Sequence, residues 1–281
     1  MAQAEQKLTT IEVLERKARG PKLTMLTAYD FAVAGLLDRA GIDILLVGDS
    51  LGMVVLGQPD TLGVTLEMMV HHVRAVARGR RRALVVADMP FLSYQVSLEQ
   101  AILNAGELVR AGAEAVKLEG GRRRAPVVEA LCNAEIPVMG HIGLTPQSVL
   151  RLGGFKVQGR EERAARALLD DARALEAAGA FALVLECVPE EVAGAISGSV
   201  AIPTIGIGAG AHCDGQVLVV NDLLGLHSSV KPPRFVRRYA DLDKEIETAA
   251  RRFADDVRQG SFPGASEAYH MNPGEASALK E

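Results

Sequence analysis

The stretch AGAEAVKLE at residues 111–119 decides the fold, because it joins the end of an expected helix to a short apolar run and a terminal glutamate. The same order returns in AGIDILLVGD at 40–49 and in AGAFALVLE at 178–186. The Ala-Gly pair suits the left-handed residue that closes a helix, and the apolar run suits a parallel strand buried on both faces. A further run, ALVVAD at 83–88, ends in an aspartate without the Ala-Gly lead. The repeat predicts alternating helices and parallel strands, with acidic residues at several strand ends.

Strands and helices alternate about eight times along the chain, which is typical of a (β/α)8 barrel, also called a TIM barrel. The expected strands cover 23–28, 42–48, 83–87, 114–118, 136–141, 181–185, 202–208 and 216–220. An open, doubly wound sheet is the alternative, but the first strand lacks the GxGxxG pattern of dinucleotide-binding folds. We expect a single domain over 1–281, with an extra N-terminal helix over 11–20, the barrel over about 22–239, a C-terminal helix over about 241–259 and a loose tail over 260–281.

The composition argues against several classes of function. The formal net charge is −4 and the pI is about 5.9, so there is no bulk attraction to nucleic acid or anionic membranes. Aromatic residues make up 4% of the chain, with no Trp, which argues against stacking platforms for single-stranded nucleic acid. No stretch approaches the length of a membrane span, and the N-terminus has no apolar signal core. The three cysteines lack CxxC spacing, so we expect free thiols and a cytoplasmic protein.

Carboxylates stand at the ends of expected strands, where α/β barrels carry their chemistry. Asp49, Asp88 and Glu119 offer only oxygen ligands, and such ligands favour Mg²⁺, which keeps positions open for water or substrate. Lys117 lies two residues from Glu119 on one strand, so both side chains face the same side. A bound Mg²⁺ could polarise the keto group of a chelating 2-oxo acid, and Lys117 could pair with the negative charge. The alternatives are turn-forming or capping aspartates and a structural ion pair.

Glu186 ends an expected strand among apolar neighbours, and burial of that kind raises the pKa of a carboxyl toward what a general base needs. We expect Glu186 to act as a base; the alternative is a cap for the next helix. His141, at the end of another expected strand, is either a structural histidine or part of the site. The glycine run at 206–210 could cradle an anion, but close strand packing needs the same glycines, and we assign no phosphate to it. The arginine runs at 80–82 and 122–124 are expected to be solvated surface.

Several longer motifs resemble one enzyme family. They are VGDSLGMVVLG at 47–57, ADMPF at 87–91, VKLEGG at 116–121, MGHIGLTPQS at 139–148, LECVP at 185–189, IGIGAG at 205–210, CDGQVLV at 213–219 and PRFVRRY at 233–239. Together they resemble the ketopantoate hydroxymethyltransferases, also called 3-methyl-2-oxobutanoate hydroxymethyltransferases, from about residue 9 to residue 239. One departure is Asn221, where some members have His, and the run LHSS at 226–229 looks variable.

The resemblance implies a barrel that transfers a hydroxymethyl group from 5,10-methylenetetrahydrofolate to 3-methyl-2-oxobutanoate, giving 2-dehydropantoate on the route to pantothenate and coenzyme A. It also implies Mg²⁺ as cofactor and a homo-oligomer, typically a decamer of two pentameric rings. The matching positions fall into three groups: the metal ligands Asp49, Asp88 and Glu119; the substrate contacts Asp49, Ser50, Asp88, Lys117 and His141; and the acceptor of the C3 proton, Glu186.

Two other functions deserve comparison with this one. A lyase or mutase of the phosphoenolpyruvate mutase and isocitrate lyase type also combines a barrel, Mg²⁺ and a 2-oxo acid. Those enzymes usually carry a Lys-Lys-Cys-Gly-His-type catalytic loop, which this sequence lacks. A non-catalytic scaffold or ligand carrier would need neither the Lys117–Glu119 pair nor a base at Glu186. We therefore expect catalysis on small-molecule substrates, with no nucleic-acid or membrane partner.

Overall fold

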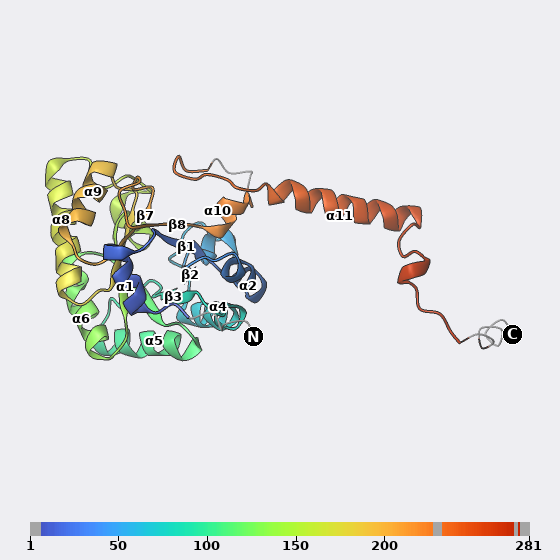
Figure 1. The fold of residues 1–281 in the computed structure, drawn as a ribbon, viewed down its shortest axis with the longest axis horizontal. Helices are drawn as coiled ribbons and strands as arrows, with labels where there is room; N and C mark the ends of the chain where they lie inside the picture. The colour runs from blue at the N-terminus through green and yellow to red at the C-terminus, as the bar shows by residue number, and fades with distance from the viewer. Residues whose placement is uncertain (1–6, 227–231, 273–274, 276–281) are drawn as a thin grey trace.

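Parallel strands close into a barrel in the computed structural model, which describes residues 7–226, 232–272 and 275 (Figure 1). The strands are β1 (Leu23–Thr27), β2 (Ile44–Val47), β3 (Leu84–Asp88), β4 (Ala115–Glu119), β5 (Val138–Gly143), β6 (Ala182–Glu186), β7 (Thr204–Ile207) and β8 (Gly215–Leu218). Each strand pairs with the next along the chain, and β8 pairs with β1. The predicted (β/α)8 barrel is confirmed, and the alternative of an open sheet is wrong.

Most of the helices form an outer layer around the barrel, and one long helix near the C-terminus projects away from it (Figure 1). The longer ones are α1 (Thr10–Arg19), α2 (Phe31–Arg39), α4 (Leu66–Gly79), α5 (Leu98–Ala111), α6 (Ala125–Asn133), α8 (Glu162–Ala177), α9 (Glu190–Ser199) and α11 (Leu242–Gln259). The short ones are α3 (Leu51–Val54), α7 (Val149–Leu152), α10 (Val220–Leu224) and the 3₁₀ turns η1 (Arg122–Arg124), η2 (Pro146–Ser148) and η3 (Ala265–Glu267). The predicted N-terminal helix is α1, and the predicted C-terminal helix is α11.

Local signals in the sequence explain where these helices begin and end. Thr9 caps α1 in a reciprocal arrangement, because its hydroxyl accepts from the Glu12 N–H and the Glu12 carboxylate accepts from the Thr9 N–H. The glycines of the three repeated Ala-Gly pairs have left-handed backbones, with φ of 87° at Gly41, 115° at Gly112 and 100° at Gly179. A side chain at such a residue would be strained. The glycine therefore ends each helix and turns the chain into the next strand.

The apolar residues of the strands alternate between two hydrophobic clusters. In β2, Ile44 and Leu46 belong to the cluster inside the barrel, whereas Leu45 and Val47 belong to the cluster under the helices. All four side chains are buried. This double burial explains the continuous apolar runs in the sequence, and it leaves the strand ends as the place for polar side chains.

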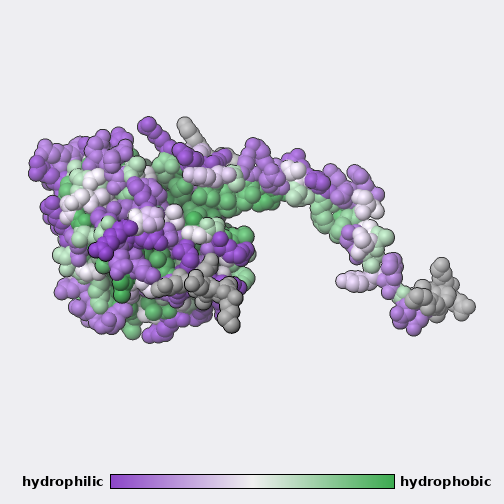
Figure 2. Space-filling view, viewed as in Figure 1, coloured by the Kyte–Doolittle hydropathy of each residue, from purple (hydrophilic) through white to green (hydrophobic). Residues whose placement is uncertain are grey.

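The outer face of β1 and β8 differs from that of the other strands. Thr24 and Gln216 are aligned neighbours on these two strands, and both are exposed. The helix that directly follows β8 is the short α10, while the long α11 projects away from the barrel (Figure 1). No residue of α11 is buried, and its Ile246 and Phe253 are 56% and 57% exposed. Figure 2 shows hydrophobic surface along one side of this projecting segment.

Four further predictions concern the membrane, the cysteines, the variable run and the C-terminal tail. None of the described helices combines the length and apolar character needed to cross a membrane. Cys132, Cys187 and Cys213 are free thiols, as expected. The run that looked variable, 226–229, lies outside the described residues except for Leu226. The described part of the predicted tail, 260–272, is mostly exposed and holds only the turn η3.

Candidate active site

Polar side chains gather at the carboxyl ends of β2, β3, β4 and β6. Asp88, Glu119 and Glu186 are the last residues of β3, β4 and β6. Asp49 lies two residues beyond the end of β2. Apart from Glu186, these acids are buried. The closed parallel barrel brings the predicted acids to one end of the fold, which is the end where barrels of this kind carry their sites.

A buried ammonium lies among these carboxylates. The Nζ of Lys117 is 2.8 Å from Asp88 Oδ1, and the strand register sets the two residues side by side. Burial lowers the pKa of Lys117, but Asp88 and two further carboxylates outweigh burial and raise that pKa. The ammonium therefore keeps its charge. Glu119 lies two residues further along β4 and is also buried, so the predicted polar face of this strand is present.

Negative charge exceeds positive charge in this part of the site. The Asp49 N–H donates to Asp88 Oδ2 at 3.0 Å, which holds the two aspartates together. Burial raises the pKa of Asp49 well above its usual value, and the charges of Asp88 and Glu119 raise it further. Such a cluster needs a bound cation or retained protons.

His141 links two acidic residues across β4, β5 and β6. Its Nε2 lies 3.2 Å from Glu186 Oε2, and its Nδ1 lies 3.5 Å from Glu119 Oε1. Burial and the charge of Lys117 lower the pKa of His141, but its pairing with these two carboxylates outweighs them and raises the pKa to about 9. The Nδ1 of His141 also lies 3.2 Å from the Lys117 ammonium, so the ring packs against one cation and two carboxylates.

The surroundings of Glu186 differ from the prediction. Its side chain is 17% exposed, and its carboxyl contacts the imidazole of His141. The expectation that apolar groups enclose this carboxyl is therefore wrong, because β5 places a histidine beside it. Its partial exposure leaves Glu186 accessible from the solvent side of the cluster, unlike the buried Asp88 and Glu119.

Two residues that the sequence analysis missed complete the network. Gln147, from the turn η2, donates its side-chain amide to Asp49 Oδ2 at 2.8 Å and its backbone N–H to Glu119 Oε2 at 2.9 Å. The Tyr94 hydroxyl lies 2.8 Å from Gln147 Oε1 and accepts from the Glu119 N–H at 3.1 Å. Gln147 lies inside the motif MGHIGLTPQS, so this motif is the sequence feature that could have pointed to Gln147 as a residue of the site.

Ser50 follows the end of β2, and Asn221 lies on α10; the two residues make different contacts. The Ser50 hydroxyl is 2.9 Å from that of Tyr29, which is buried. Asn221, on α10, lies with its side-chain amide 3.5 Å from the carbonyl oxygen of Val54 on α3. The residue that departs from the family pattern thus links two short helices, while Ser50 stays next to the acidic cluster.

Comparison with known proteins places this geometry in a family. The model of the family described as "Ketopantoate hydroxymethyltransferase" matches residues 7–265. A 3-methyl-2-oxobutanoate hydroxymethyltransferase of Syntrophus aciditrophicus is 56% identical over 258 residues, which cover 92% of this chain and 94% of that protein. A protein of the same name from Enterococcus faecalis is 54% identical over 267 residues, covering 95% of this chain and 97% of that one. The chain belongs to the ketopantoate hydroxymethyltransferase family. The resemblance of the motifs is confirmed, and the protein is a hydroxymethyltransferase.

Solved structures with low sequence identity to this family member have the same barrel fold. A phosphonopyruvate hydrolase in complex with oxalate and Mg²⁺ superposes with a TM-score of 0.60 at 14% identity, covering 97% of this chain and 95% of that one. A 2,3-dimethylmalate lyase of the phosphoenolpyruvate mutase and isocitrate lyase superfamily gives 0.57 at 18% identity, covering 97% of both chains. At such identities the likeness concerns the fold alone.

The acidic cluster of this family member fits an oxygen-preferring cation by its chemistry. Its buried carboxylates outnumber the nearby cations, and the charges of Asp88 and Glu119 add to burial in raising the pKa of Asp49. The carboxylates do not form a closed cage: in the part of the chain that the structure describes, no group of three or more His, Cys, Asp or Glu side chains could hold a metal ion. Mg²⁺ commonly uses only one or two carboxylates, with water and substrate oxygens as the other ligands. The assignment of Asp49, Asp88 and Glu119 as ligands stays a prediction.

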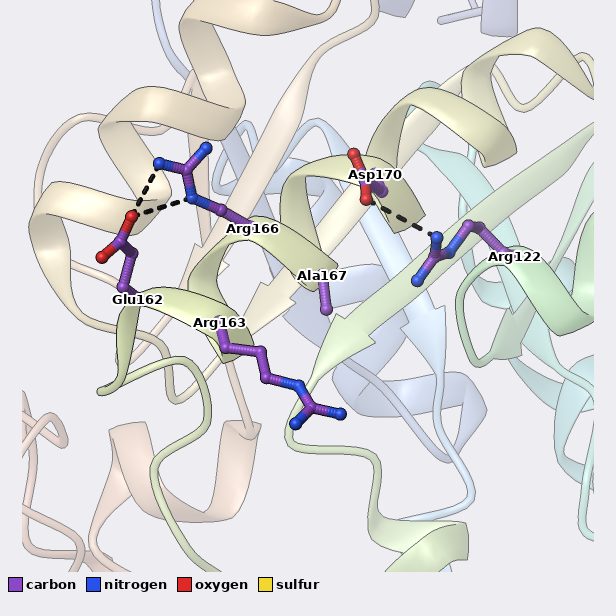
Figure 3. A pocket seen from close by; sticks show the side chains of 6 residues that line it. All are labelled: Arg122, Glu162, Arg163, Arg166, Ala167 and Asp170. Carbon is purple, nitrogen blue, oxygen red and sulfur yellow. Dashed lines mark hydrogen bonds and ion pairs between the residues drawn. The ribbon is translucent and has the colours of Figure 1, made fainter.

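A separate surface pocket of this hydroxymethyltransferase lies on the outer wall, against α8 and η1 (Figure 3). Arg166 pairs there with Glu162 at 2.6 Å, and both side chains are exposed, as is Arg122. None of the strand-end residues lines it. The expectation of solvated arginine runs holds for Arg122 but is wrong for Arg80, whose side chain is 9% exposed and pairs with Glu114 at 2.9 Å.

Proposed function

We propose that this chain transfers a hydroxymethyl group from 5,10-methylenetetrahydrofolate to 3-methyl-2-oxobutanoate, giving 2-dehydropantoate for the synthesis of pantothenate and coenzyme A. Membership of the family supports the class of reaction. The names of the relatives supply the acceptor, and the motif resemblance supplies the donor. The observation that carries the proposal is a pair of contacts in one cluster: Lys117 to Asp88 at 2.8 Å and His141 to Glu186 at 3.2 Å.

Glu186 is the proposed base that removes the proton from C3 of the 2-oxo acid. It is the least buried acid of the cluster, so a ligand at the barrel mouth can approach its carboxylate. The His141 ring lies against that carboxylate, with its Nε2 3.2 Å from Glu186 Oε2. General base catalysis of this kind typically contributes about 10²- to 10⁴-fold in rate.

The other side chains of the cluster bind and orient the acceptor in this proposal. Asp49, Asp88 and Glu119 would hold Mg²⁺, which when bound acts as a Lewis acid on the keto group. Lys117, whose ammonium keeps its charge, offsets negative charge that develops on the substrate. Ser50, whose hydroxyl lies 2.9 Å from that of Tyr29, would contact the substrate beside these acids.

A product assay tests the proposed reaction. The purified protein is incubated with 3-methyl-2-oxobutanoate and 5,10-methylenetetrahydrofolate, with and without Mg²⁺, and 2-dehydropantoate is measured. We expect product only when both substrates and Mg²⁺ are present. Absence of product under these conditions would contradict the reaction, and full activity in the presence of excess chelator would contradict the role of the metal.

We also propose that the chain assembles with copies of itself, with a decamer as the expected order. The exposed Ile246, Phe253 and Val257 lie seven and four residues apart on α11, so they share one face of the helix. The exposed, aligned Thr24 and Gln216 mark an outer face of the barrel that is open to a partner. A second copy of the chain has both the apolar face of α11 and the open outer face of the barrel. Packing α11 of one copy against another copy would remove the apolar face of that helix from water.

A further inference from the structure

Gln147 connects the ends of three strands from a turn that follows a fourth. Its backbone N–H donates to Glu119 Oε2 at 2.9 Å, at the end of β4. Its side-chain Nε2 donates to Asp49 Oδ2 at 2.8 Å, beyond β2, and to the carbonyl oxygen of Met89 at 2.9 Å, beyond β3. Gln147 is buried. One residue of η2 therefore sets the spacing of two carboxylates that come from different strands.

The partners of Gln147 also determine which way its amide points. Its Oε1 accepts from the Tyr94 hydroxyl at 2.8 Å and from Gln95 Nε2 at 3.2 Å. With the two bonds from Nε2, every donor and acceptor position of the amide is used. If oxygen and nitrogen exchanged places, an oxygen would face both the Asp49 carboxylate and the Met89 carbonyl. That repulsion excludes the exchanged orientation, so the amide is a fixed donor toward Asp49.

The carboxylates of Glu119 and Asp49 each bond Gln147 through one oxygen, which leaves the second oxygen of each free of Gln147. Glu119 bonds Gln147 through Oε2, while its Oε1 faces His141 at 3.5 Å. Asp49 bonds Gln147 through Oδ2, and no hydrogen bond from a described side chain or backbone group reaches its Oδ1. Outer hydrogen bonds of this type orient the carboxylates that bind metals.

We propose that Gln147 is a positioning residue that fixes the Asp49 carboxylate, and with it the geometry of the cation site. The inference rests on the proposed function, since it needs a cation between these strand ends. Gln147 acts through Asp49 and touches neither the acceptor nor the reacting carbon. Among the side-chain bonds of Gln147, only the one to Asp49 reaches a predicted cation ligand, since the others go to Tyr94, Gln95 and the carbonyl oxygen of Met89. The bond to Glu119 comes from the backbone N–H, which a substitution of the side chain keeps.

Binding of Mn²⁺ to the chelator-treated protein, measured by titration calorimetry and by the Mn²⁺ electron paramagnetic resonance spectrum, tests this inference without using activity. Gln147→Met keeps most of the volume and removes the donor. We expect its affinity for Mn²⁺ to fall by about 10- to 100-fold, as is typical when an outer partner of a metal ligand is lost. The matched control Gln95→Leu removes a partner of Gln147 but leaves the bond to Asp49, and we expect wild-type affinity and an unchanged spectrum.

The outcomes separate this inference from the proposed function. If the wild type and Gln147→Met bind Mn²⁺ equally well, the positioning role is overturned and the proposed reaction stands. If the wild type binds no Mn²⁺, the cation site of the proposed function fails, and this inference fails with it. If Gln147→Met does not fold, Gln147→Asn provides the same test, because it keeps an amide but withdraws it by one methylene from Asp49. Equal binding by that variant would also overturn the inference.

Discussion

The ammonium of Lys117 lies 2.8 Å from the Asp88 carboxylate, and both side chains are only 5% exposed. A buried pair of this kind is a weak source of stability, because the desolvation of two charges offsets their attraction. The pair lies at the ends of β3 and β4 beside further carboxylates, and this arrangement suits the binding of a charged ligand. The pair is therefore informative about both stability and function.

Removal of the Lys117 charge should destabilise the protein strongly. We expect Lys117→Met to lower the free energy of unfolding by about 3–5 kcal/mol, because it leaves the buried carboxylates uncompensated. Urea denaturation in the presence of chelator measures this. The exposed pair of Arg166 and Glu162 provides the control, and we expect Arg166→Met to cost about 0–1 kcal/mol. Equal losses in the two variants would contradict our account of the buried cluster.

Asp88 should matter for binding of the cation together with the acceptor. We expect Asp88→Asn to weaken Mg²⁺-dependent binding of 3-methyl-2-oxobutanoate by about tenfold or more, since it removes a charged oxygen donor. Titration calorimetry with and without Mg²⁺ measures the change. Glu162→Gln removes an exposed negative charge elsewhere and should leave binding unchanged. An unchanged affinity for Mg²⁺ in Asp88→Asn would remove Asp88 from the ligand set.

Asp38 should make the stability depend on pH in acid. Its carboxylate accepts from the backbone N–H groups of Arg81, Arg82 and Ala83 at 2.8, 3.0 and 2.7 Å. Burial raises the pKa of Asp38, but these three donors outweigh burial and hold it below its usual value. Because the pKa is lower in the folded chain, the stabilisation is complete above the unfolded pKa of about 3.9 and is lost as the pH falls through the folded pKa.

The variant Asp38→Asn checks this prediction. At neutral pH we expect it to lower the free energy of unfolding by about 1–3 kcal/mol, because the amide leaves buried N–H groups poorly paired. The difference from the wild type should shrink as the pH falls from about 4, where the carboxyl of the unfolded chain becomes protonated, through the lower pKa of the folded chain. Denaturation at several pH values gives the comparison, and a difference that does not change with pH would exclude the charge as its cause.

The apolar face of α11 should control assembly. We expect the double substitution Ile246→Ser and Phe253→Ser to lower the mass of the particle in sedimentation velocity, because it makes the exposed face polar. Arg251→Ser with Asp255→Ser changes the opposite face of the same helix and should keep the wild-type mass. A wild-type mass for both variants would show that α11 is not the interface.

The barrel and its acidic strand ends could be predicted from the sequence because both depend on short-range signals. Left-handed glycines precede three of the strands, and buried apolar runs mark the strands themselves; the closed sheet then brings Asp49, Asp88, Glu119 and Glu186 to one end. The network around Gln147 depends instead on contacts between distant segments, since its partner Asp49 is 98 residues away. No periodic pattern specifies such a pair.

Two further features could not be derived from local patterns. The apolar neighbours of Glu186 in the sequence face other layers of the fold, so they said nothing about the histidine that β5 sets beside its carboxyl. The sequence predicted a C-terminal helix over about 241–259, and α11 is present there. That prediction did not extend to the position of its apolar residues, which lie away from the barrel of their own chain.

The most direct test of the central claim is hydrogen exchange at C3 of 3-methyl-2-oxobutanoate in D₂O, followed by NMR with Mg²⁺ and without the folate. The wild type should replace the C3 proton by deuterium. Glu186→Gln, which keeps the size of the side chain but cannot accept the proton, should still bind the acceptor with Mg²⁺ and should lose the exchange by about 10²-fold or more. Exchange at the wild-type rate in Glu186→Gln would show that Glu186 is not the base.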